Sequence, residues 1–175
     1  MNDRYIFREI KKEEVPQMFS LIRERMKWMD EMGIHQWNAA NYDQIYPLSY
    51  YHERRLKGEA FVLAVKETGE LISAGVLKEQ DDRWNDKEPA IYLHNFVAKE
   101  GARGAGSIFL RFAEEYAAQK GKKYLRLDSA EDNASLERYY SSQGFVPAGT
   151  CTEGMYKGIL RQKELLPLLT GDGCE

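Results

Sequence analysis

The stretch EGARGAGSIFLRF, residues 100–112, has the composition of an anion-binding turn that leads into a helix. Glycines let a phosphate approach the backbone closely, and the first N–H groups of a helix have no partner inside the helix. The helix dipole adds partial positive charge at the same place. The candidate backbone donors are Gly104, Ala105, Gly106 and Ser107, and the candidate cations are Lys99 and Arg103. A plain tight turn before a helix would explain the same residues.

A second candidate group lies in NASLERYYSSQGF, residues 133–145. Asn133 and Tyr140 are seven residues apart, about two helical turns, so they share one helix face. A phenol with a pKa of about 10 can protonate a leaving thiolate whose thiol has a pKa of about 8.5. The alternative is that Tyr140 is an aromatic side chain that packs in the core from an amphipathic helix. Asn133 is also a strong N-cap residue, a role that is compatible with ligand contact.

These groups need strands and helices to position them, and the hydrophobic pattern predicts a β-α-α-β-β-β-α-β-α-β-β order. The glycine-rich turn follows a strand over 90–98 and opens a helix with an apolar stripe that includes Phe109 and Ala113. Such an order indicates an α/β (α+β) fold with a single mixed, mostly antiparallel central sheet flanked by helices. The predicted strands are 5–10, 60–67, 71–79, 90–98, 123–129, 145–149 and 155–160. The predicted helices are 11–33, 47–58, 133–143 and one that carries the apolar stripe over 108–117 and is capped by Gly121.

Composition narrows the class of protein. The 175 residues suit one domain, predicted over 1–167, with a flexible C-terminal tail over 168–175. With 25 basic and 28 acidic residues, no basic excess points to nucleic acid. The two cysteines have no metal-ligand spacing, so we expect no metal. No apolar run has the length of a membrane span, and the charged start lacks a signal peptide, which predicts a cytoplasmic protein.

The strand, the glycine-rich turn, the helix LRFAEEYAAQKG and the following YLRLDS…N……YxxxGF pattern resemble the GNAT superfamily of N-acetyltransferases. The resemblance is close over residues 90–146. It implies acetyl-CoA as cosubstrate, bound in a V between two splayed central strands. The family's turn can be matched in two registers. We prefer the one that places Gly104 and Gly106 at the glycine positions and Gly101 at the basic position, because it keeps bulky residues away from the phosphate. The other register matches Arg103 to the basic position and puts Ile108 in a small-residue position.

The resemblance also implies roles for single residues. Tyr140 would be the general acid, and the N–H of Val97 would polarise the thioester carbonyl. Asn133 would contact the pantetheine arm. The strand residues implied to lie against the cofactor are Phe96, Val97 and Ala98. His94 is the candidate general base, although a strand histidine with a structural role is commoner, and Glu131, Asp128 or a water chain are alternatives.

The acceptor side is expected in the aromatic-rich region that follows the first helix, which resembles the variable wall of the acceptor site in this family. Its candidate pocket residues are Trp28, Trp37, Tyr42 and Tyr46, and core packing beneath a loop is an equal alternative. Asp128 is a further candidate contact for the acceptor. The acidic loop over 79–88 would attract a cationic acceptor or would simply be a solvated face.

The function that this resemblance implies is transfer of an acetyl group from acetyl-CoA to a primary amine of a small molecule, directly in a ternary complex. A protein or peptide amine is the alternative acceptor. A non-catalytic acyl-CoA-binding regulatory module on the same fold is the alternative outside catalysis. The resemblance also implies a possible homodimer formed through the terminal strands.

Overall fold

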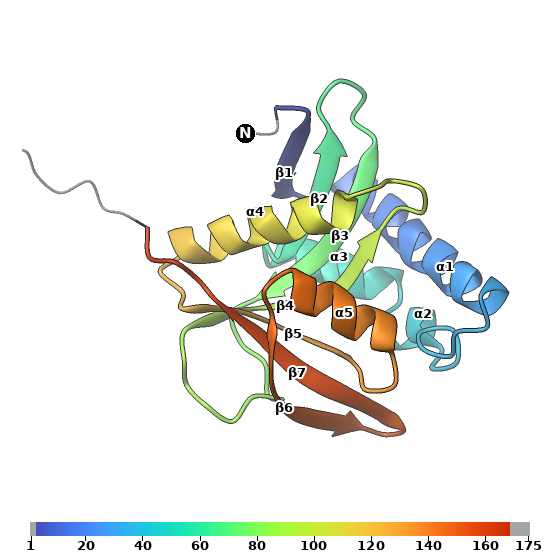
Figure 1. The fold of residues 1–175 in the computed structure, drawn as a ribbon. Helices are drawn as coiled ribbons and strands as arrows, with labels where there is room; N and C mark the ends of the chain where they lie inside the picture. The colour runs from blue at the N-terminus through green and yellow to red at the C-terminus, as the bar shows by residue number, and fades with distance from the viewer. Residues whose placement is uncertain (1–2, 169–175) are drawn as a thin grey trace, which may run out of the picture. The chain divides into compact units, whose positions relative to one another are not determined.

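The computed structural model describes residues 3–168, and its seven strands form a mixed, mostly antiparallel sheet in the order β1-β2-β3-β4-β5-β7-β6 (Figure 1). This confirms the predicted fold class. The strands are β1 Tyr5–Glu9, β2 Ala60–Val65, β3 Leu71–Lys78, β4 Ala90–Ala98, β5 Tyr124–Ala130, β6 Val146–Glu153 and β7 Tyr156–Glu164. The helices are η1 Lys12–Glu14, α1 Val15–Glu31, α2 Tyr42–Ile45, α3 Leu48–Leu56, α4 Ala105–Gln119 and α5 Ala134–Ser142.

The described residues fall into two compact units. One comprises the chain up to Lys78 together with Leu93–Leu110, and the other comprises Glu79–Tyr92 and the described residues from Arg111 onward. Strand β4 and helix α4 each pass from one unit to the other. The prediction of one domain over 1–167 stays a prediction, and the predicted tail lies outside the described residues except for Leu168.

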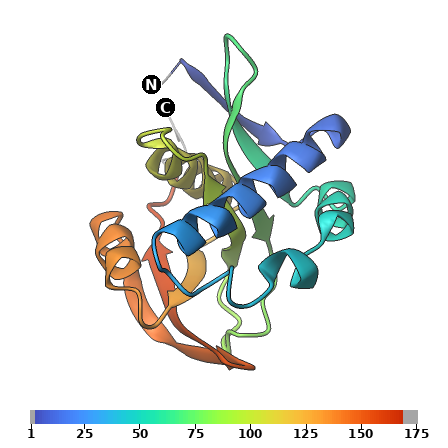
Figure 2. The ribbon, with the colours of Figure 1, turned by 90° about the vertical axis from the view of Figure 1, so that its right-hand side faces the viewer.

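The first unit is built on the antiparallel strands β1, β2 and β3, with helices α1 and α3 packed beside one another (Figure 2). Helix α1 buries Val15, Met18 and Ile22 completely, at the i, i+3, i+7 spacing of one helix face. Each such side chain contributes about 1.5–3 kcal/mol of hydrophobic stabilisation. Pro16 lies in the first turn, and Gly33, with φ of +68°, follows the helix end.

Strand β3 contains a glycine because helix α4 comes close to it. A Cβ at Gly75 would lie 2.8 Å from Leu93 Cδ1 and 3.0 Å from Phe109 Cζ. Phe109 is fully buried, and its ring lies 5.2 Å from Phe7 and 5.2 Å from Phe96, centroid to centroid. The missing side chain at Gly75 therefore lets the start of α4 pack against the strands that precede it.

The second unit is built on β5, β7 and β6, which pair antiparallel, with the start of β4 parallel to β5. Arg126 on β5 is only 1% exposed, and its guanidinium lies 4.1 Å from the Trp84 ring centroid. It donates to both oxygens of Asp86, at 2.7 and 2.8 Å. The acidic loop is therefore more than a solvated face, because Asp86 neutralises a buried cation.

The structure adds detail that the sequence pattern does not contain. The predicted element order is confirmed, with η1 and the single-turn helix α2 as additions. Strands β6 and β7 extend to Glu153 and Glu164, well beyond the predicted segments. Gly69, between β2 and β3, takes a φ of +75° within a turn over 66–70. Among residues 3–168, no helix combines the length and the apolar character that crossing a bilayer requires.

Candidate active site

The glycine-rich turn connects the end of β4 to the start of α4, as the sequence predicts. Gly101 and Gly104 have φ of +80° and +78°, a backbone conformation that favours glycine. The Ala102 N–H donates to the Lys99 carbonyl, and the Ala105 N–H donates to the Ala102 carbonyl. A Cβ at Gly101 or Gly104 would meet no atom within 4 Å, so backbone conformation, and not crowding, favours glycine there. Gly106 and Ser107 lie in the first turn of α4.

The charged side chains around this turn differ in their exposure and in their partners. Arg103 is exposed, and Lys99 is paired with Glu70. Arg25 of α1 donates from Nη2 to the Ala98 carbonyl at 2.8 Å, where β4 ends. Burial lowers the pKa of Arg25, and the carboxylate of Glu100 opposes that shift. Sequence reasoning missed Arg25, because a basic residue at a polar helix position carries no signal of a contact made 73 residues later.

The end of β4 is held by side chains from its neighbours. The Ser73 hydroxyl donates to the Val97 carbonyl at 2.9 Å. Asn95 is 5% exposed and has φ of +51°, a left-handed conformation inside a strand. His94 and Phe96 on either side of it are half-buried. The sequence offered one signal, because Asn is among the few non-glycine residues that tolerate this conformation.

Three aromatic rings from the predicted acceptor region and one from α3 contact one another in series in the first unit. We call this series the aromatic ladder, and it consists of Trp37, Tyr42, Tyr46 and Tyr50, with centroids 4.4, 4.8 and 4.8 Å apart in that order. All four rings are partly buried and pack against the hydrophobic core that α1 and α3 share with the sheet. Burial raises the pKa values of the Tyr42 and Tyr50 phenols above their usual range.

The structure thus brings together Trp37, Tyr42 and Tyr46 of the predicted pocket residues, and it adds Tyr50. Trp28 contacts Arg25 instead, whose guanidinium lies 4.7 Å from its ring centroid.

Helix α5 in the second unit carries the predicted acid and the predicted cap. Asn133 accepts a hydrogen bond from the Leu136 N–H at 3.0 Å, which confirms the capping role. Tyr140 is 8% exposed, and its ring makes edge contacts with Tyr139 and Phe145. Burial raises the pKa of the Tyr140 phenol, Tyr139 and the Asp128 carboxylate raise it further, and the Arg161 guanidinium opposes the rise.

Asp128 and Arg161 lie on the strands of this unit. Asp128 accepts from Arg83 Nη1 at 2.8 Å and from the Tyr156 hydroxyl at 2.6 Å, so both its oxygens are engaged. Arg161 is 2% exposed, and its Nε donates to the Ser129 hydroxyl at 2.8 Å. Sequence reasoning missed Arg161, because basic residues at alternating positions of a terminal strand usually face solvent.

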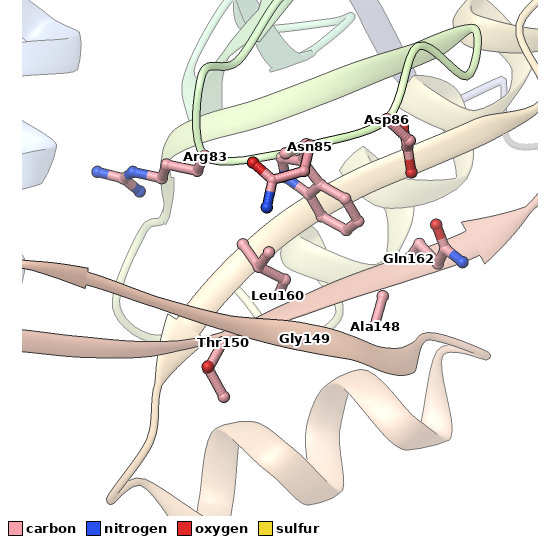
Figure 3. A pocket seen from close by; sticks show the side chains of 9 residues that line it. Arg83, Asn85, Asp86, Ala148, Gly149, Thr150, Leu160 and Gln162 are labelled. Carbon is pink, nitrogen blue, oxygen red and sulfur yellow. The ribbon is translucent and has the colours of Figure 1, made fainter.

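A cavity of about 460 Å³ lies in the second unit between the loop at 83–86 and the β6–β7 hairpin (Figure 3). The Arg83 side chain points away from it, while Asp86 and Gln162 accept hydrogen bonds from the buried Arg126. None of the predicted site residues lines this cavity. Its lining residues are Arg83, Trp84, Asn85, Asp86, Ala148, Gly149, Thr150, Leu160 and Gln162.

Known proteins share both the sequence pattern and the fold. The sequence model of the Acetyltransferase (GNAT) family matches residues 20–145. The uncharacterized N-acetyltransferase YesJ of Bacillus subtilis (strain 168) is 25% identical over 163 residues, which cover 87% of this chain and 86% of that protein.

Solved structures add the fold. The crystal structure of a GNAT-family acetyltransferase from Listeria monocytogenes 4b F2365 is similar with a TM-score of 0.75 and 23% identity, covering 92% of this chain and 95% of that one. The PaiA N-acetyltransferase of Thermoplasma acidophilum, solved in complex with coenzyme A, is similar with a TM-score of 0.70 and 18% identity, covering 91% and 98%.

Proposed function

Because the chain belongs to the GNAT family of acetyl-CoA-dependent N-acetyltransferases, we propose that it acetylates a primary amine of a small molecule. The observation that carries the choice of acceptor is the aromatic ladder. Its successive rings, from Trp37 before α2 to Tyr50 on α3, make a continuous wall, which suits a small acceptor better than an extended polypeptide. Transfer is direct, in a ternary complex of enzyme, acetyl-CoA and amine.

The glycine-rich turn receives the pyrophosphate of acetyl-CoA. The N–H groups at the start of α4, around Gly104 and Gly106, point along a helix axis whose dipole favours an anion. This proposal gives Arg103 a secondary role, because its side chain is exposed. Arg25, close to the same turn, supplies a more fixed positive charge.

Transfer then proceeds by attack of the neutral amine on the thioester carbonyl. The C–N bond forms, the C–S bond breaks, and the sulfur takes the proton of Tyr140, while the amine gives up its proton to a base. A tyrosine phenol is protonated at neutral pH, so Tyr140 has a proton to donate. Burial raises its pKa, which weakens it as an acid, and the Arg161 guanidinium opposes that rise. The N–H of Val97 stabilises the charge that develops on the carbonyl oxygen.

The remaining predicted residues have supporting roles in this proposal. His94, on β4 close to Val97, is the candidate base that deprotonates the amine. Asn133 contacts the pantetheine arm while it also caps α5. Asp128 acts on the acceptor through its electrostatic field, since Arg83 and Tyr156 already engage both its oxygens.

The experiment that tests the proposed acceptor is thiol release from acetyl-CoA across a panel of amines. The panel contains small primary amines, lysine-containing peptides and peptides with free N-termini. We expect saturable turnover with at least one small amine and a kcat/KM at least about 10-fold above that of the peptides, the discrimination that one pocket contact provides. Turnover with peptides alone would overturn the small-molecule acceptor. Binding of CoA without any turnover would favour a regulatory module.

A further inference from the structure

The middle of strand β4 contains a conformation that is costly for its residue. Asn95 is the only described non-glycine residue besides Asn41 with a positive φ, and it lies inside a strand and is 5% exposed. A left-handed residue inside a strand turns the adjacent peptide groups away from the directions of a regular ladder. Such residues persist only where their surroundings hold them in place, and they occur often at functional sites.

Two tyrosine hydroxyls hold the Asn95 side chain. The Tyr50 hydroxyl donates to Asn95 Oδ1 at 2.9 Å, and Asn95 Nδ2 donates to the Tyr42 hydroxyl at 2.6 Å. One tyrosine comes from α2 and the other from α3, and both belong to the aromatic ladder. The amide is therefore fixed from two directions, and we call Asn95, Tyr42 and Tyr50 the clamp.

The residues that follow the clamp are pinned as well. The Phe96 ring packs against Phe109, the Val97 carbonyl accepts from Ser73, and the Ala98 carbonyl accepts from Arg25. These contacts leave the strand end little freedom to adjust by itself. The dihedral angles of Asn95 orient the peptide group between Asn95 and Phe96, so the direction in which the chain enters this fixed segment depends on the conformation of Asn95.

We propose that Asn95, held by Tyr42 and Tyr50, is a positioning residue that aims the backbone N–H groups of Phe96 and Val97 at the thioester carbonyl. The clamp also joins the acceptor wall to the acetyl site, because its two tyrosines are members of the aromatic ladder. This inference rests on the proposed function, in which the β4 backbone polarises the carbonyl.

A purely structural explanation competes with this proposal, because Asn tolerates a positive φ without any partner. Variants separate the two. Asn95→Gly keeps the backbone conformation accessible but removes both hydrogen bonds, whereas Tyr50→Phe and Tyr42→Phe each remove one bond and leave Asn95 in place. The matched control is Tyr51→Phe, next to Tyr50 on α3. Within the described residues, the buried Tyr51 hydroxyl has no hydrogen-bond partner.

The kinetic experiment measures kcat, both KM values and the Kd for CoA in the full-length protein. We expect Asn95→Gly and Tyr50→Phe to lower kcat by about 10- to 100-fold, the scale of a misplaced or lost oxyanion donor. The Kd for CoA should change by less than about 3-fold, because the turn residues are untouched, and Tyr51→Phe should match the wild type. A kcat within about twofold of wild type in both clamp variants would overturn the proposal.

A second measurement keeps the clamp testable without turnover. The backbone amide resonances of Phe96 and Val97 are compared in the presence of CoA and of acetyl-CoA. We expect acetyl-CoA to shift these resonances further than CoA in the wild type and in Tyr51→Phe, and the difference to shrink in Tyr50→Phe. If these shifts are observed but the protein acetylates no amine, the proposed function is overturned and the role of the clamp is supported. Equal responses to CoA and acetyl-CoA in the wild type would overturn the clamp.

Discussion

Two strand-to-helix connections in this protein differ in how they treat the unpaired backbone N–H groups at the start of the helix. Helix α5, which follows β5, is capped by the side chain of Asn133, which accepts from the Leu136 N–H. Helix α4, which follows β4, is preceded by Gly104, which has no side chain to offer. The Asn133 side chain occupies one N–H group at the start of α5, whereas Gly104 has no side chain that could do the same for α4. Backbone N–H groups at the start of a helix favour an anion. In the proposed mechanism, the β4–α4 connection contributes backbone N–H groups and the β5–α5 connection contributes the Tyr140 side chain.

The largest expected effect comes from removing the side-chain chemistry. Tyr140→Phe should lower kcat at neutral pH by a factor on the order of 10 to 10³, with the KM for acetyl-CoA little changed, because only proton donation to sulfur is lost. Steady-state kinetics measures both constants. The neighbouring Tyr139→Phe is the matched control and should keep its kcat.

The same variant has a pH signature. A general acid acts only when it is protonated, so wild-type kcat should fall as the pH rises through the pKa of Tyr140. Burial raises that pKa, so the fall should lie above the usual tyrosine value of about 10. An alkaline limb that is identical in Tyr140→Phe and in the wild type would remove Tyr140 from the mechanism.

The next effect tests the uncapped connection. Gly104→Asp places a carboxylate beside the start of α4, where it competes with the pyrophosphate and repels it. We expect the Kd for CoA to rise by roughly 100-fold in calorimetry, since like charges at such a site cost several kcal/mol. Gly69→Asp is the control, because Gly69 also has a positive φ and open space at its Cβ but lies in the β2–β3 turn. Equal Kd values in the two variants would contradict a phosphate site at Gly104.

The smallest effect tests the cap. Asn133→Ala should lower the free energy of unfolding by about 1 kcal/mol, because the Leu136 N–H loses its acceptor. Asn133→Asp keeps an acceptor and should restore that stability in thermal or denaturant unfolding. If Asn133 also contacts the pantetheine arm, the KM for acetyl-CoA will stay raised in the Asp variant. A KM that recovers together with stability would leave capping as its whole role.

Sequence reasoning reached the local features of the site and missed its long-range partners. The helix ends at Gly33, Gly121 and Gly144 follow from glycine's access to positive φ, which is a property of one residue. Arg25 and Arg161 were missed, because their contacts with Ala98 and Ser129 cross 73 and 32 residues. Nothing in the local pattern distinguishes these arginines from solvated ones.

The aromatic region shows the same limit. Its composition predicted either an acceptor wall or core packing, and the structure shows rings that pack on the core and also contact one another in the aromatic ladder. Which ring meets which depends on how α2 and α3 fold back on the sheet. The sequence therefore did not indicate that Tyr50 belongs to the aromatic ladder or that Trp28 lies against Arg25.

The sequence by itself determined the order of strands and helices, the glycine-rich turn before α4, and the capped helix that carries Tyr140. Each of these follows from spacing, periodicity and the conformational range of single residues. Only the tertiary structure decided that Asn95 takes a left-handed conformation and that Tyr42 and Tyr50 hold it there. The physical reason is that a strained residue is stabilised by partners that lie 45 and 53 residues away along the chain, and folding alone brings them together.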